Sequence, residues 1–170
     1  MYGGGCIYVS SMAVDEDHRI RLYSSASKTG HFQTTTVTDA ALALHTLRLD
    51  GFVFLESYAT TGYLATRPVR FHGPDLRLNV RAPYGRVRVQ LTDSKGAALT
   101  GFAFEDSVPF TGDELFHRPT WKGEPALAQL GETPAHIEIE ITRGELYAIR
   151  GDLSIHTANP NVLRAVEHQW

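Results

Sequence analysis

Strict alternation of apolar and polar residues between positions 76 and 91 is the feature that most constrains the fold. Apolar side chains occupy every second position in two runs: Leu76, Leu78 and Val80, then Val87, Val89 and Leu91. A period of two is typical of a strand with one buried and one solvated face. Because Ala82-Pro83-Tyr84-Gly85 separates the runs, we expect an antiparallel hairpin whose apolar face lies on a core.

Further segments typical of strands recur along most of the chain, with turn residues about every 10 residues. Alternation is seen in 18–24, 62–71 and 137–141, and the other segments read as strands are 6–14, 42–48, 52–55, 101–104 and 146–149. The spacing predicts an all-β fold, an antiparallel β-sandwich of jelly-roll or concanavalin-like type with about ten short strands. We expect a short helix only at the C-terminus, where Asn159 caps, Pro160 takes the first helical position and Trp170 shares an apolar face with Val162.

Size and composition fit one well-buried core, with 170 residues and 42% hydrophobic content. Residues 25–38 are rich in Ser, Thr and Gly, which indicates a linker. We therefore expect a hairpin over 1–32, a sandwich over 33–155 and a tail or short helix over 156–170. No apolar run reaches the ~20 residues of a membrane helix, and the start lacks the features of a signal peptide. The expectation is a soluble chain whose compartment the sequence does not indicate.

A series of short motifs runs in a recognisable order. In chain order they are Leu49-Asp50-Gly51-Phe52-Val53, residues 62–68, Leu76-Arg77-Leu78-Asn79, Arg86-Val87-Arg88-Val89, Gly101-Phe102, Glu105-Asp106-Ser107, Gly112-Asp113, Trp121-Lys122-Gly123 and Leu146-Tyr147-Ala148. The series resembles the C-terminal β-sandwich that follows a five-bladed β-propeller in bacterial proteins similar to glycoside hydrolase families 32 and 43. Residues 1–32 resemble the closing hairpin of such a propeller, a remnant of its last blade.

This resemblance implies an accessory module of a glycoside-hydrolase-like protein that stabilises its propeller, oligomerises or contacts carbohydrate. The catalytic carboxylates of those enzymes project from the early blades, so no catalytic residue is carried over to this chain. Two alternatives remain open. One is a free-standing β-sandwich that binds a protein partner, and the other is a glycosidase in its own right that uses the acidic loop around Asp106 and Asp113.

Carbohydrate contact needs a flat aromatic ring for the sugar's C–H face and polar groups for its hydroxyls. Trp121 and Tyr84 are the candidate platforms, and Asp113, His117 and Arg118 are the candidate hydroxyl partners. An exposed aromatic ring rimmed by polar residues marks a binding patch. A tryptophan in a strand is more often buried than displayed, so a core position is the competing interpretation of Trp121.

Acidic residues cluster between positions 105 and 114. Glu105, Asp106 and Asp113 could hold a calcium ion, but their spacing is not that of an EF-hand. Carboxylates in such loops more often accept hydrogen bonds from turn amides. The eight histidines form no zinc-binding pattern. We therefore predict neither a metal nor a cofactor as a resident group.

Four arginines fall on one face of the expected hairpin: Arg77, Arg81, Arg86 and Arg88. With Tyr84 beside them they resemble a nucleic-acid platform. However, the chain has 16 basic and 19 acidic residues, and a later strand carries Glu138 and Glu140. Cross-strand ion pairs explain the arginines better. We expect no nucleic-acid or membrane partner; the partners to test are a carbohydrate and a second copy bound through the N-terminal hairpin or the C-terminal helix.

Overall fold

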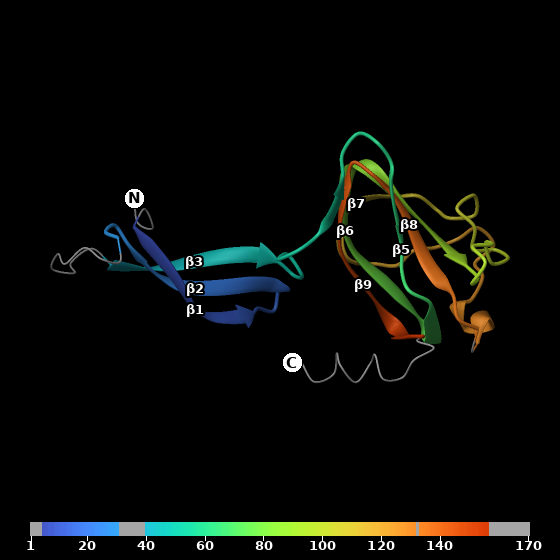
Figure 1. Cartoon of the computed structure of the whole chain (residues 1–170), viewed down its shortest axis with the longest axis horizontal. Helices are drawn as coiled ribbons and strands as arrows, with labels where there is room; N and C mark the ends of the chain where they lie inside the picture. The colour runs from blue at the N-terminus through green and yellow to red at the C-terminus, as the bar shows by residue number, and fades with distance from the viewer. Residues whose placement is uncertain (1–4, 31–39, 132, 157–170) are drawn as a thin grey trace. The chain divides into compact units, whose positions relative to one another are not determined.

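The computed structural model describes residues 5–30, 40–131 and 133–156 and divides into two compact units, Met1–Val53 and Phe54–Trp170 (Figure 1). Antiparallel strands supply nearly all of the regular structure, which confirms the predicted all-β class. The helical element within the described ranges is a single 3-10 turn, η1 (Leu127–Leu130). No helix in those ranges has the length and apolar character needed to cross a membrane. The expected C-terminal helix lies outside the described residues.

The first unit is a three-stranded antiparallel sheet with the order β1-β2-β3: β1 (Cys6–Val14), β2 (Arg19–Ser27) and β3 (Ala40–Arg48). The hairpin expected over residues 6–24 is confirmed. Its turn is fixed by Asp15, whose carboxylate accepts hydrogen bonds from the Arg19 amide at 2.9 Å and from Arg21 Nε at 2.5 Å. These bonds lower the pKa of Asp15, and the bond from the Arg19 amide has the largest effect.

The boundary between the units differs from the one expected at residue 32. Strand β3 pairs with β2 along its whole length, from Ala40 opposite Ser27 to Arg48 opposite Arg19. It therefore belongs to the first unit, which ends at Val53. The apolar run after the Asp50-Gly51 turn does not pair back on β3; β4 (Leu55–Ser57) pairs with β9 instead.

The second unit is one strongly curved antiparallel sheet. Its strands are β4, β5 (Gly62–Ala65), β6 (Val69–Thr92), β7 (Phe110–His117), β8 (His136–Thr142) and β9 (Gly144–Ile155). The strand order is β4-β9-β6-β8-β5, with β7 also paired to β6. Figure 1 shows these strands wrapping around a common interior. Pro68 lies just before β6, and β5 is an edge strand; proline lacks the amide that a strand interior needs, so it suits this strand end.

The hairpin expected over residues 76–91 is wrong, because β6 runs through it without reversing. The first half of β6 pairs with β9 and its second half pairs with β8. The expected turn Ala82-Pro83-Tyr84-Gly85 is a corner at which the strand changes partner. Gly85 passes close to the β8–β9 turn there: a Cβ atom on it would lie 1.9 Å from the carbonyl oxygen of Thr142.

The core lies inside the curved sheet, and both apolar rows of β6 contribute to it as predicted. Leu78, Val80 and Leu91 have no exposed surface, and Ile137 and Ile139 of β8 lie among them. Phe102 from the β6–β7 connection and Trp121 from the β7–β8 connection complete the cluster. The period-two pattern therefore identified the buried positions correctly, although it assigned the wrong partner strand.

The β6–β7 and β7–β8 connections also cover the edge of β6 that faces away from β8. The Val89 amide donates to Ser107 Oγ at 3.0 Å, and the Val89 carbonyl accepts from Trp121 Nε1 at 2.8 Å. The Leu91 amide donates to the Phe102 carbonyl at 3.0 Å. An open strand edge is a template for unwanted pairing, and these bonds occupy that edge with groups of the same unit.

Candidate functional site

A surface groove of about 400 Å³ opens beside the corner of β6. Its walls come from residues 56–59, from β6 residues 81–84 and from residues 143–145 at the β8–β9 turn. The three segments are distant in sequence and meet because the two halves of β6 pair with β9 and β8. The groove therefore exists only because β6 bends instead of forming a hairpin.

Two exposed tyrosines line this groove. Tyr84, at the corner of β6, is 87% exposed, and Tyr58, just after β4, is 73% exposed. A hydrogen bond with the Glu56 carboxylate raises the pKa of Tyr58 above its ordinary value. The groove thus presents two aromatic rings to solvent beside a carboxylate, which is the combination that an amphipathic ligand needs.

One wall of the groove is formed by the ion pair between Arg81 and Glu145. Arg81 Nη1 donates to Glu145 Oε1 at 3.0 Å and to Oε2 at 3.2 Å, and the Tyr147 hydroxyl donates to the same carboxylate. Asp113 of β7 approaches from the other side, with its Oδ2 atom 3.8 Å from Arg81 Nε. The Glu145 bond is the main cause of a raised Arg81 pKa. These contacts fix the orientation of Arg81 at the groove wall.

Arg143 is the groove residue with the most unusual backbone. Its φ of 50° lies in the left-handed region that favours glycine, and its amide donates to the Tyr58 carbonyl at 2.9 Å. Such a backbone costs about 1 kcal/mol or more for a residue with a side chain. The side chain is exposed, and its guanidinium forms no ion pair within residues 5–30, 40–131 and 133–156. The Arg143 guanidinium is therefore available to donate hydrogen bonds to a ligand.

Of the five predicted carbohydrate-contact residues, Tyr84 lines the groove, whereas Asp113 does not line it and only contacts the lining residue Arg81. Trp121 does not line it either. It is 4% exposed, its indole donates to a backbone carbonyl, and its ring meets Phe102 edge-on with centroids 5.0 Å apart. The platform assignment for Trp121 is therefore wrong, because neither ring face is open; the competing core interpretation holds.

His117 and Arg118 are also outside the groove lining. The His117 ring stacks on Phe110 with centroids 3.9 Å apart, and its Nδ1 atom lies 3.4 Å from Glu114. Burial lowers the pKa of His117, and attraction to Glu114 opposes this only in part. Arg118 instead approaches Asp75, at 3.4 Å.

The acidic residues proposed as calcium ligands are not gathered. The Asp106 amide closes a turn onto the Ala103 carbonyl, Lys122 Nζ donates to the Glu105 carbonyl, and the Asp113 carboxylate faces Arg81. Within the part of the chain that the structure describes, no three His, Cys, Asp or Glu side chains come together as a metal site. The calcium set Glu105, Asp106 and Asp113 is therefore not supported.

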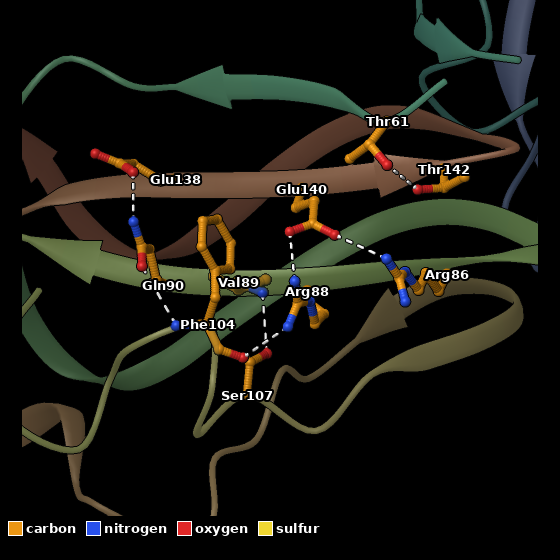
Figure 2. Close-up of polar contacts among 10 residues, drawn as sticks. All are labelled: Thr61, Arg86, Arg88, Val89, Gln90, Phe104, Ser107, Glu138, Glu140 and Thr142. Carbon is orange, nitrogen blue, oxygen red and sulfur yellow. Dashed lines mark hydrogen bonds and ion pairs between the residues drawn. The ribbon is translucent and has the colours of Figure 1, made fainter. Parts of the chain in front are cut away.

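Cross-strand pairing of arginine with glutamate is borne out for three of the four arginines, two of which share Glu140. Figure 2 shows Glu140 of β8 between Arg86 and Arg88 of β6. Arg88 also donates to the Phe104 carbonyl at 3.3 Å, with its guanidinium 5.5 Å from the Phe104 ring centroid. Beside it, Gln90 Nε2 donates to Glu138 at 2.6 Å (Figure 2).

The other two arginines lie on the first half of β6. Arg77 Nε lies 2.8 Å from Asp75 Oδ1, whereas Arg81 faces Glu145. The expectation that all four share one hairpin face is wrong because the corner of β6 separates them.

Sequence reasoning missed Tyr58, Glu56 and Arg143. Arg143-Gly144 has the composition of a turn between two apolar segments, but nothing in the sequence indicated that it meets Tyr84. Comparisons of the chain with protein-family models, with curated proteins and with solved structures found no match. The resemblance to glycoside-hydrolase sandwiches therefore rests on the sequence motifs alone.

Proposed function

We propose that this chain is a non-catalytic accessory module of a glycoside-hydrolase-like protein and that its second unit contacts carbohydrate through the groove beside Tyr84. The observation that supports this most is the pair of exposed tyrosines, Tyr84 and Tyr58, on one groove. A sugar ring has apolar C–H faces and a rim of hydroxyls, so it gains from stacking on an aromatic ring with polar groups around it.

The polar groups of the groove suit a polyol. Arg143 offers guanidinium donors, and the Glu56 carboxylate offers acceptors. A pair of hydroxyls on neighbouring carbons can accept hydrogen bonds from the Arg143 guanidinium and donate them to the Glu56 carboxylate. Arg81 and Glu145 bind each other and so form a fixed wall. The Glu145 carboxylate also accepts from Tyr147, so we assign it an orienting role and propose no catalytic residue.

Glycan-array screening of the full chain, followed by calorimetric titration with the best oligosaccharide, tests this proposal. Tyr84→Ala and Tyr58→Ala should each weaken binding about tenfold, because loss of an aromatic contact costs roughly 0.5–1.5 kcal/mol beyond the area lost. Tyr63→Ala is the matched control: Tyr63 on β5 is also 73% exposed but does not line this groove. Its binding should match that of the unchanged chain.

Absence of binding to every glycan on the array would reject the carbohydrate role and leave stabilisation or oligomerisation of a larger protein. Equal loss in Tyr63→Ala and Tyr84→Ala would also reject this groove as the site.

A second candidate function is protein binding by the first unit. The observation that favours it is the number of apolar side chains that its sheet exposes, among them Met12, Val9 and Leu42 at 58%, 56% and 77%.

A further inference from the structure

The three-stranded sheet of the first unit has one face that is almost wholly apolar. Residues paired across an antiparallel sheet point to the same side. The register places Ile20 beside Val14 and Leu47, and Leu22 beside Met12 and His45. We call this side, which continues through Ser24 and Ala26 of β2, the apolar face. It carries no Asp, Glu, Lys or Arg on any of its three strands.

The two polar side chains of the apolar face, Ser24 and His45, are hydrogen-bonded to each other. Ser24 Oγ and His45 Nε2 form a hydrogen bond of 2.8 Å, and Ser24 has no exposed surface. Covering this face would therefore leave neither group without a partner, which removes the usual cost of burying them. The opposite face carries the cations Arg19, Arg21 and Arg48, which suit water.

A sheet with one apolar face needs a second layer on it. The β1 row of the apolar face is half exposed: Ile7 47%, Val9 56%, Met12 58% and Val14 53%. These are four large side chains in a row, more than the scattered apolar residues that ordinary surfaces display.

We infer that a second copy of this chain covers the apolar face and that the two sheets pack face to face about a two-fold axis parallel to their strands. The first reason is charge: an uncharged face meets its own copy without like-charge repulsion. The second reason is shape. The row of the apolar face on β3 begins with the small residues Ala41 and Ala43, whereas the β1 row is large throughout.

A two-fold axis parallel to the strands places the β1 row of one copy over the β3 row of the other. Ile7 of one copy then lies over Ala41 of the other, and Val9 lies over Ala43. The two-fold axis repeats both contacts, so at two places in the dimer large side chains pack over small ones. An axis perpendicular to the strands would stack the two β1 rows on each other. At the other end of the face the same axis places Met12 over His45 and Val14 over Leu47. The match of large to small side chains at the Ala41–Ala43 end therefore favours the axis parallel to the strands as the isologous arrangement.

The area of the apolar face indicates how tightly the dimer should form. Three strands of nine residues give a flat face of about 14 by 30 Å, about 400 Å² in projection. A standard stable interface buries about 800 Å² on each partner. We therefore expect a reversible dimer that forms in the micromolar range, on the order of 10 µM. This inference does not depend on the carbohydrate groove, which lies in the other unit.

Sedimentation velocity of the full chain from about 1 to 200 µM tests the inference, a range that spans the expected dissociation constant. The sedimentation coefficient should rise with concentration to that of a dimer. Met12→Glu places a carboxylate in the β1 row of the apolar face, which would lie against the partner, and should weaken the dimer about tenfold or more. Leu42→Glu makes the same change on the opposite face, at a side chain 77% exposed, and should leave the dimer unchanged.

Circular dichroism checks that each variant is folded. If Met12→Glu is not folded, Val9→Thr replaces it, because threonine keeps the branched shape and adds a hydroxyl. Val9→Thr should weaken the dimer more than Leu42→Thr does. A chain that stays monomeric to about 200 µM overturns the inference. So does a dimer that loses as much affinity in Leu42→Glu as in Met12→Glu, because its interface would then lie elsewhere.

Discussion

Nη2 of Arg88 lies 2.6 Å from Oε2 of Glu140, and the Glu140 side chain is only 5% exposed. Arg86, 56% exposed, reaches the other oxygen of that carboxylate at 3.4 Å. A charge taken out of water is tolerated when its partners supply both attraction and hydrogen bonds. This triad therefore joins the second half of β6 to β8, on the side of the sheet that faces away from the core.

Glu140→Ala should lower the free energy of unfolding of the second unit by about 2 kcal/mol or more, because it leaves Arg88 partly buried without its carboxylate. Arg86→Ala is the matched comparison on the same network. It should cost less than about 1 kcal/mol, since an exposed arginine contributes little through its ion pair. Urea unfolding followed by circular dichroism measures both, and equal losses in the two variants would contradict the burial argument.

Trp121→Phe should destabilise the second unit by about 2 kcal/mol, because it deletes the bond to the Val89 carbonyl and part of a filled core volume. The same variant should bind carbohydrate as the unchanged chain does, since the ring is buried. Urea unfolding and calorimetric titration on one preparation give the two readings. Weaker carbohydrate binding with unchanged stability would show that Trp121 faces a ligand.

The alternation in the sequence was sufficient to predict the all-β class and the buried rows of β6, because burial on one face of a strand depends only on local periodicity. It was not sufficient to predict partners. The corner at Pro83 and Gly85 resembles a hairpin turn in composition, and what distinguishes the two is the distant β8–β9 turn against which Gly85 packs. Long-range pairing of this kind is not encoded in any short window.

The candidate site was predictable only in part for the same reason. Tyr84 was among the candidate platforms, and it lies in the segment where a turn was expected. Tyr58 and Arg143 come from segments that the hairpin interpretation kept apart, so they carried no signal. Trp121 illustrates the opposite case: an aromatic residue in a loop-rich region is attractive as a platform, yet the unpaired edge of β6 binds its indole.

His117 should make the stability of the second unit depend on pH. Its folded pKa is lowered, chiefly by burial, whereas an imidazole in the unfolded chain titrates near pH ~6.5. As the pH falls below that value the unfolded state binds the proton first, so stability present above pH ~6.5 is lost as the pH falls through the folded pKa. His117→Phe should remove this decline while keeping a ring against Phe110.

Unfolding free energies of the two proteins between pH ~8 and ~5 measure this effect, as the difference between wild type and variant. Glu114→Gln should enlarge the decline, because it removes the attraction that favours the charged imidazole. Parallel pH profiles for wild type and His117→Phe would show that other groups cause the dependence.

Gly85→Ala tests whether the corner of β6 depends on close backbone contact. The added Cβ would lie 1.9 Å from the Thr142 carbonyl oxygen and 2.4 Å from that of Arg143. Both atoms belong to the backbone of the β8–β9 turn, so relief requires separating strands that pair Arg86 with Thr142. We expect a loss of about 3 kcal/mol or more in the free energy of unfolding.

Gly96→Ala separates this clash from ordinary glycine strain. Gly96 has a φ of 80° and open space around its Cβ position, so alanine there should cost only about 1 kcal/mol, from backbone strain. Gly85→Ala should also weaken carbohydrate binding, because moving the corner away from the β8–β9 turn separates Tyr84 from Arg143 across the groove. If urea unfolding gives equal costs for the two variants, the corner is not held by this contact and the groove does not depend on it.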